Sequence, residues 1–93
     1  MILHWSSGFK RALKKLLSDS PEAKEKLHTV LQSLQSDPHS LHLRTHKLKG
    51  ELRNCWACYV EYDMRIVFQF VVNNKTKERE ILLLDIGSHD EVY

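Results

Sequence analysis

Hydrophobic residues in the first part of the chain recur at helical spacing. Between residues 6 and 17 they lie mostly three or four positions apart, which places them on one face of an amphipathic helix. They are Phe9, Ala12, Leu13, Leu16 and Leu17. Either Ser6 or Ser7 can cap the start of this helix with its hydroxyl oxygen. The pattern therefore predicts a helix over residues 6–17 whose opposite face carries lysine and arginine.

A second helix is predicted over residues 18–38. Its apolar positions again share one helical face, and they are Ala23, Leu27, Val30, Leu31 and Leu34. Ser20 is a favourable N-cap, Pro21 suits the first helical position, and Asp37-Pro38 closes the segment. The short gap between the two segments predicts an antiparallel helical hairpin.

Beyond the second helix the helical period is lost and the chain takes on the composition of strands. Residues 39–50 form a predicted loop that is rich in histidine and lysine and stops at Gly50. Three strand-like segments follow, separated by a tight turn around Asp63 and by a second short loop. These segments are 52–62, 65–73 and 79–87.

With a short first strand at residues 1–5, the predicted order of elements is β-α-α-β-β-β. Consecutive strands joined by short connections form an antiparallel meander, and the helices must cover one face of it to bury their apolar stripes. We therefore predict an α+β fold, an antiparallel sheet covered on one face by a helical hairpin. Residues 1–93 are expected to form a single domain, because the chain is long enough for one modest core only.

Composition indicates the cellular compartment in which we expect the protein. Hydrophobic residues make up 42% of the chain and charged residues 28%, as in ordinary soluble proteins. No apolar run approaches the roughly 20 residues that a membrane span requires, and the first residues lack the features of a signal peptide. We expect a cytoplasmic protein, in which the two cysteines, Cys55 and Cys58, stay reduced.

Positive charge is concentrated in the front part of the chain. Residues 1–53 contain 10 Lys/Arg and 5 Asp/Glu, a net of +5, whereas residues 54–93 contain 4 and 7, a net of −3. A basic segment favours contact with a polyanion, and nucleic acid is the commonest polyanion in the cytosol. Lysine-rich helix faces are also simply solvated in many proteins, so charge alone leaves both interpretations open.

Histidines and cysteines supply the ligand types of a zinc site, with His42 and His46 ahead of Cys55 and Cys58. The two cysteines fall within a predicted strand, however, where residues three apart point to opposite faces of the sheet. A redox dithiol would instead need a helix start to lower its thiol pKa. We interpret both cysteines as packing residues and expect no metal and no cofactor.

Several groups able to move protons or bind phosphate are predicted near one end of the sheet. Asp63 lies at a hairpin turn, Arg65 starts the next strand, and His89 and Tyr93 follow the neighbouring strand. An acid, a base, a guanidinium and a phenol can cleave RNA without a metal. The base takes the ribose 2′-OH proton, the cation stabilises the phosphorane, and the acid protonates the leaving 5′-oxygen. A turn-stabilising aspartate beside a surface ion pair is the simpler interpretation of Asp63 and Arg65.

Three short motifs, in this order, resemble the RelE/ParE superfamily of bacterial toxins. They are "HKLKG", "YVEYDMRIVF" and "DIGSHDEVY". The likeness covers nearly the whole chain and is closest to the YafQ-like branch of ribosome-dependent mRNA endonucleases. Each motif is weak alone, but together, at matching spacing, they are specific.

The resemblance implies the functional residues. It places catalytic groups at His46, Asp63 and His89, with the final aromatic at Tyr93. One family position departs from the pattern, because Tyr59 stands where the family has a second histidine. A tyrosine can donate a hydrogen bond to phosphate but is a poor proton shuttle at neutral pH.

Two further positions near the turn differ from the branch. Met64 replaces the aromatic residue that follows the aspartate, which weakens stacking on a base. Arg65 matches an arginine used by relatives outside the YafQ-like branch. The catalytic set implied is thus a hybrid of His46, Asp63, Arg65 and His89.

We therefore expect a toxin of a type II toxin–antitoxin system that cuts mRNA on the ribosome. Either His46 or Asp63 is the base, His89 the acid and Arg65 the phosphate clamp, while Tyr59 and Tyr93 orient the substrate. Basic side chains would grip mRNA or rRNA phosphates. These are Lys10, Arg11, Lys14, Lys15, Lys47, Lys49 and Arg53.

The resemblance also implies a partner, an antitoxin whose C-terminal segment wraps the toxin and covers its basic or catalytic surface. Two other functions share the fold. One is a ParE-like DNA gyrase poison, which acts by binding without catalysis, and the other is an inactive binding module.

Overall fold

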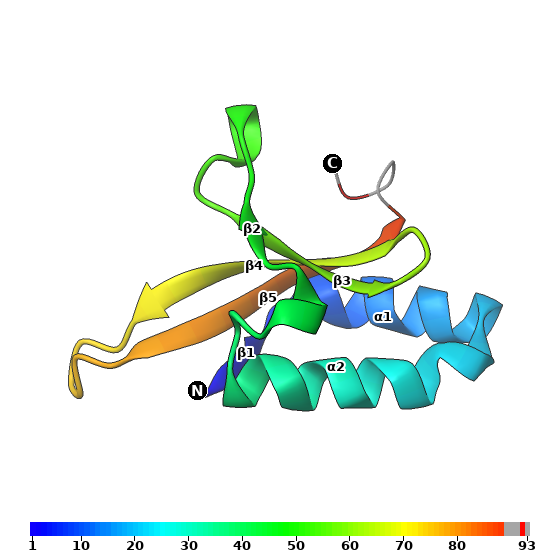
Figure 1. The fold of residues 1–93 in the computed structure, drawn as a ribbon, viewed down its shortest axis with the longest axis horizontal. Helices are drawn as coiled ribbons and strands as arrows, with labels where there is room; N and C mark the ends of the chain where they lie inside the picture. The colour runs from blue at the N-terminus through cyan, green and yellow to red at the C-terminus, as the bar shows by residue number, and fades with distance from the viewer. Residues whose placement is uncertain (89–91, 93) are drawn as a thin grey trace.

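A computed structural model describes residues 1–88 and 92 of the chain. The helical elements are α1 (Ser7–Asp19), η1 (Pro21–Ala23), α2 (Lys24–Ser36), η2 (Leu41–Leu43) and η3 (Gly50–Leu52). The strands are β1 (Leu3–Trp5), β2 (His46–Lys47), β3 (Trp56–Glu61), β4 (Met64–Val72) and β5 (Arg79–Ser88). One five-stranded sheet, in the order β1-β5-β4-β3-β2, has α1 and α2 side by side on one face (Figure 1). The predicted α+β class is confirmed.

The first helix forms where its periodicity predicts. The Ser6 hydroxyl accepts a hydrogen bond from the Phe9 amide at 3.0 Å, so Ser6 rather than Ser7 is the N-cap. Phe9 is completely buried, and the other residues of the predicted apolar face pack against the same core. Sequence pattern and packing therefore agree on which face of α1 meets the sheet.

The second predicted helix is divided into two elements. It starts with the single 3-10 turn η1, and α2 begins only at Lys24. Pro21 occupies the first turn as predicted, but the Ser20 side chain makes no capping hydrogen bond. The Ser20 backbone amide instead bonds to the Leu16 carbonyl at the end of α1, at 2.7 Å. Ser20 thus closes the first helix and does not cap the second with its side chain.

Neither α1 nor α2, the longest helices of residues 1–88 and 92, has the length and apolarity to cross a membrane.

The predicted antiparallel meander is confirmed for β3, β4 and β5, but the sheet as a whole is mixed. Strand β1 pairs in parallel with β5, with Leu3 opposite Ile81. This pairing joins the front of the chain to its last described strand, a connection that short-range pattern cannot indicate. The predicted loop 39–50 also contains the two-residue strand β2, which forms the other edge of the sheet beside β3.

Both faces of the sheet are covered, but by different parts of the chain. On the helix side, Phe9 packs with Val30, Ile66, Phe68 and other buried residues in the main core. On the opposite face a second cluster, which we call the outer cluster, is made of Leu48, Cys55, Ala57 and Val67. The β2–η3 segment extends on this side, away from α1 and α2 (Figure 1). We call this side of the sheet the outer face.

The two cysteines lie on opposite faces of the sheet, as predicted from their spacing. Cys58 belongs to the main core and Cys55 to the outer cluster, and both are free thiols. Burial raises the pKa of Cys58 to about 12 because a thiolate cannot be solvated there. Cys58 is therefore a protonated, unreactive packing residue, and the pair cannot share one metal without breaking the strand.

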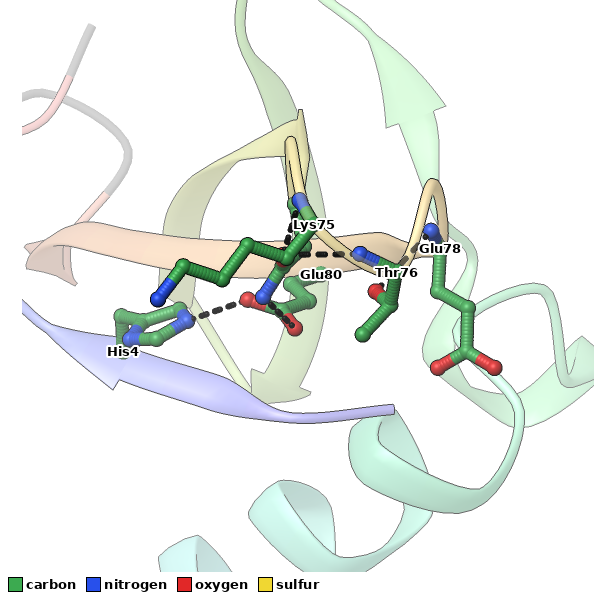
Figure 2. A network of polar contacts seen from close by, with 6 residues as sticks. His4, Lys75, Thr76, Glu78 and Glu80 are labelled. Atoms are coloured by element: carbon green, nitrogen blue, oxygen red, sulfur yellow. Dashed lines mark hydrogen bonds and ion pairs between the residues drawn. The ribbon is translucent and has the colours of Figure 1, made fainter.

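A polar network fixes the β1 edge of the sheet (Figure 2). His4 Nε2 lies 2.7 Å from one oxygen of the buried Glu80 carboxylate, and the Asn73 amide donates to the other oxygen at 3.1 Å. The Asn73 side-chain oxygen in turn accepts from the Lys75 and Thr76 amides. These hydrogen bonds lower the pKa of Glu80, with the His4 contact contributing most. A charged carboxylate thereby ties β1 to the β4–β5 loop.

Candidate active site on the outer face

Strand register brings three of the predicted functional side chains to the outer face. His46 is paired with Ala57 and Tyr59 with Arg65, and residues directly opposite in an antiparallel pair share a face. Because Ala57 and Tyr59 are two apart along β3, all four side chains point the same way. Ala57 is fully buried within the outer cluster, while His46 is exposed and Tyr59 and Arg65 are half-buried.

Tyr59 and Arg65 form the rigid part of this site. The Tyr59 hydroxyl accepts a hydrogen bond from the Tyr62 amide at 3.0 Å. One nitrogen of the Arg65 guanidinium donates to the Tyr62 and Met64 carbonyls at 3.0 and 3.1 Å. The Arg65 guanidinium carbon also lies 5.0 Å from the Tyr59 ring centroid, within the range of a cation–π contact. The turn between β3 and β4 thus holds both side chains in place.

His46 is held in one tautomer by the chain just before it. Its Nδ1 lies 2.9 Å from the Arg44 carbonyl oxygen. A carbonyl can only accept, so Nδ1 carries a proton and Nε2 is the acceptor in the neutral ring. Within the part of the chain that the structure describes, Nε2 has no hydrogen-bond partner. An exposed imidazole with a fixed proton on Nδ1 and an available Nε2 is suited to act as a base.

Arg44 belongs to this site, although the sequence analysis did not single it out. Its guanidinium carbon lies 5.0 Å from the Tyr59 ring centroid, the same distance as that of Arg65. Its backbone is left-handed, with φ 49°, at the end of η2. This unusual conformation lets the carbonyl meet His46 while the side chain reaches Tyr59. The only signal in the sequence was a cation two residues before the motif histidine.

Asp63 lies in the two-residue turn between β3 and β4, as predicted, but its carboxylate does not pair with Arg65. Among residues 1–88 and 92, Asp63 has no ion pair, and the Arg65 guanidinium bonds to backbone carbonyls instead. Asp63 lines a cavity of ≈ 470 Å³ between α1, this turn and the end of β5. Among the described residues, Asp19 and Glu61 also line this cavity, and Lys15 is the lysine beside them. The ion-pair interpretation of Asp63 and Arg65 is therefore wrong.

The end of the chain is described only in part. Val92 packs against the outer cluster, on the face that carries His46, Tyr59 and Arg65. The two predicted tail residues, His89 and Tyr93, lie outside the described residues. Their roles remain predictions.

The basic residues predicted to bind RNA fall into two separate groups. Lys10, Arg11, Lys14 and Lys15 are on α1, in the helix layer, and all are exposed. Lys47, Lys49 and Arg53 are on or beside β2 and η3 and are also exposed. Lys47 is paired with Trp56, which packs against the main core, so its side chain points to the face opposite that of His46. Helices and the β2–η3 segment lie on opposite sides of the sheet (Figure 1). Only the second group adjoins His46, so the predicted set does not form one surface.

Similarity to known proteins identifies the family of this chain. Residues 1–93, the whole chain, match the family model for the bacterial toxin of type II toxin–antitoxin systems, YafQ. The chain belongs to the YafQ toxin family. It is thus a toxin of the type II class, as its motifs predicted.

Solved structures agree with the YafQ assignment at the level of fold. A copper-bound mutant toxin from Helicobacter pylori is 26% identical, with a TM-score of 0.76, and 100% of this chain and 99% of that one are covered. YafQ from E. coli is 16% identical, with a TM-score of 0.76 and coverage of 98% and 96%. The chain in the E. coli DinJ–YafQ complex is 16% identical, with a TM-score of 0.75, and 98% of this chain and 96% of that one are covered. No curated protein matches the chain in sequence.

Proposed function

We propose that this YafQ-family toxin is a ribosome-dependent endoribonuclease that cuts mRNA without a metal. The observation that carries the proposal is the outer face itself. It places the fixed-tautomer His46 on the same side of the sheet as Tyr59 and the Arg65 guanidinium. A base, a phenol and a phosphate-binding cation on one rigid surface are the groups that RNA transesterification needs.

In the proposed reaction, His46 Nε2 takes the proton of the ribose 2′-OH. The 2′-oxygen then bonds to phosphorus while the bond from phosphorus to the 5′-oxygen breaks. His89 donates a proton to that departing oxygen. The products are a 2′,3′-cyclic phosphate and a 5′-hydroxyl. Arg65 would stabilise the negative phosphorane, and Tyr59 and Tyr93 would orient the substrate.

Between the two candidate bases, the geometry favours His46 over Asp63. Only His46 has an acceptor nitrogen available beside the cations of the outer face. Asp63 lines the cavity next to α1, where a phosphodiester would meet several carboxylates. Asp63 would then shape the turn that positions Arg65. The ribosome would supply the in-line orientation of the 2′-oxygen, which a domain of this size cannot easily impose alone.

An antitoxin is the proposed partner. The similar E. coli YafQ is found in a complex with DinJ. For this chain we propose a cognate antitoxin that covers the outer face or the basic residues beside it, which would hold the toxin inactive by excluding RNA.

The test is primer extension on an mRNA translated in a cell-free system. Wild-type protein is compared with His46→Ala, His89→Ala and the control His28→Ala, since His28 is an exposed histidine on α2 away from the outer face. We expect cuts that need ribosomes, persist in His28→Ala and fall by on the order of 10²–10⁴ in the other two variants.

Two results would contradict the proposal. Cleavage by folded His46→Ala at the wild-type rate would remove His46 as the base. Intact mRNA with the wild-type protein, together with inhibited DNA supercoiling in a gyrase assay, would replace the nuclease by a gyrase poison.

A further inference from the structure

A second cavity adjoins the outer face and differs in charge from the one that Asp63 lines. It has a volume of ≈ 490 Å³ and lies between α2, the η2 segment and β3. Its polar lining comes from Lys26, His42, Arg44 and Tyr59, and the remaining lining side chains are apolar. Among residues 1–88 and 92, no carboxylate lines this cavity. Two cations in a lining without a carboxylate give the cavity a positive potential suited to an anion.

The polar groups around the cavity are held in position. The Arg44 amide donates to the Leu41 carbonyl at 3.2 Å, and the left-handed turn at Arg44 directs its guanidinium over Tyr59. His42 contacts the hydroxyls of Ser40 and Ser33 through its two ring nitrogens, at 2.9 and 3.1 Å. A site whose donors are already placed loses less entropy when it binds a ligand.

Tyr59 connects this cavity to the proposed catalytic groups. Arg44 and Arg65 each lie 5.0 Å from the Tyr59 ring centroid, so their guanidinium carbons are at most about 10 Å apart. Neither guanidinium has a carboxylate partner among the described residues. Two guanidiniums on one ring add to the positive potential of this part of the surface, which favours a bound anion.

We propose that Lys26 and Arg44 form a second phosphate site, which takes an RNA phosphate next to the one that Arg65 binds. Arg44 is the central residue, because it also positions His46 through its carbonyl. The guanidinium can contact two phosphate oxygens at once, whereas Lys26 acts as a point charge. This inference rests on the proposed nuclease function for the identity of the anion. An acidic protein segment is the competing occupant.

Binding is measured by fluorescence anisotropy with a short 2′-O-methyl RNA, which binds but cannot be cut. The variants are Arg44→Gly and Lys26→Gln. Glycine suits the left-handed backbone at position 44, so it removes the side chain without straining the turn. Lys75→Gln is the control, because Lys75 is exposed on the loop at the far end of β4 and its hydrogen bond to Asn73 uses only its backbone amide.

We expect Arg44→Gly and Lys26→Gln each to weaken RNA binding by about 3- to 10-fold at low salt, and Lys75→Gln to have little effect. The slope of log affinity against log salt should fall by about 0.7 for each phosphate that the variant no longer neutralises. Circular dichroism should show the same fold in all variants.

Three outcomes would overturn the site. The first is equal RNA affinity and salt slope in Arg44→Gly, Lys26→Gln and the control. The second is a wild-type protein that does not bind the RNA. The third is a loss in Arg44→Gly of binding to a polyglutamate peptide only, which would assign the cavity to an acidic protein segment. The nuclease proposal is tested separately, because a wild type that leaves translated mRNA intact while Arg44→Gly loses RNA affinity refutes the nuclease and keeps the site.

Discussion

Substitutions at Tyr59 test how much its ring and its hydroxyl each contribute to the stability of the site. The ring contacts two guanidinium groups, and the hydroxyl accepts one hydrogen bond from the turn. Tyr59→Phe removes only the hydroxyl. Tyr59→Leu also removes the aromatic face, so the two variants separate the contributions.

The expected magnitudes follow from these contacts. The Tyr62 amide is at the surface, where water can replace the missing acceptor, so Tyr59→Phe should cost about 0.5 kcal/mol in the free energy of unfolding. Each exposed cation–π contact contributes about 0.5–1 kcal/mol, so Tyr59→Leu should cost about 1–2 kcal/mol more. For a domain of this size, a decrease of 1 kcal/mol lowers the Tm by roughly 4–8 °C.

The assay is urea unfolding followed by tryptophan fluorescence, since Trp56 lies on the same strand as Tyr59. A double-mutant cycle of Tyr59→Leu with Arg44→Gln should give a coupling free energy of about 0.5–1 kcal/mol. Equal stability of Tyr59→Phe and Tyr59→Leu, or a coupling of zero, would refute the idea that the ring organises the two arginines.

Two further predictions concern groups away from the site. Because the folded-state pKa of Glu80 is lowered below its ordinary value of 4.5, its contribution to stability is present above that value and is lost as the pH falls through the folded pKa. Glu80→Gln should therefore have a lower free energy of unfolding than wild type at pH 6, and it should lose less of that free energy on acidification below about 4.5. Urea titrations at several pH values measure both effects. Parallel curves of stability against pH for the two proteins would contradict the prediction. Cys58, with a pKa of about 12, should resist iodoacetamide at pH 8 in the folded protein and react once urea unfolds it, and rapid labelling of Cys58 in the native state, read by mass spectrometry, would show that its burial is wrong.

The sequence predicted those features that depend on neighbouring residues. The apolar face of α1, its serine cap and the turn at Asp63 follow from local pattern, and each is found in the structure. The family motif singled out His46 but left it in a predicted loop, whereas the structure has it in β2. The opposite faces of the two cysteines followed from the strand period alone.

Features that depend on distant contacts were not predicted. Two residues are too short a run to show strand periodicity, so β2 exists only because β3 pairs with it. The place of Arg44 depends on a left-handed backbone, which is uncommon outside glycine, and on the position of Tyr59 across a strand edge. Glu80 has the sequence context of an ordinary surface acid, yet His4 and Asn73 make its burial possible. The basic residues of α1 and those at 47–53 both belong to the basic front part of the chain, but the sheet separates α1 from the β2–η3 segment in space.

The position of β5 in the sheet has a consequence for how the protein is made. It is the last described strand in the chain, yet it lies between β1 and β4 in the middle of the sheet. Until it emerges from the ribosome, β1 and β4 have no common neighbour, and Phe9 has no complete core to fill. Co-translational folding of residues 1–78 alone would leave two open strand edges. The sheet therefore cannot be completed until β5 has left the ribosome tunnel, whatever part of the chain has folded before it.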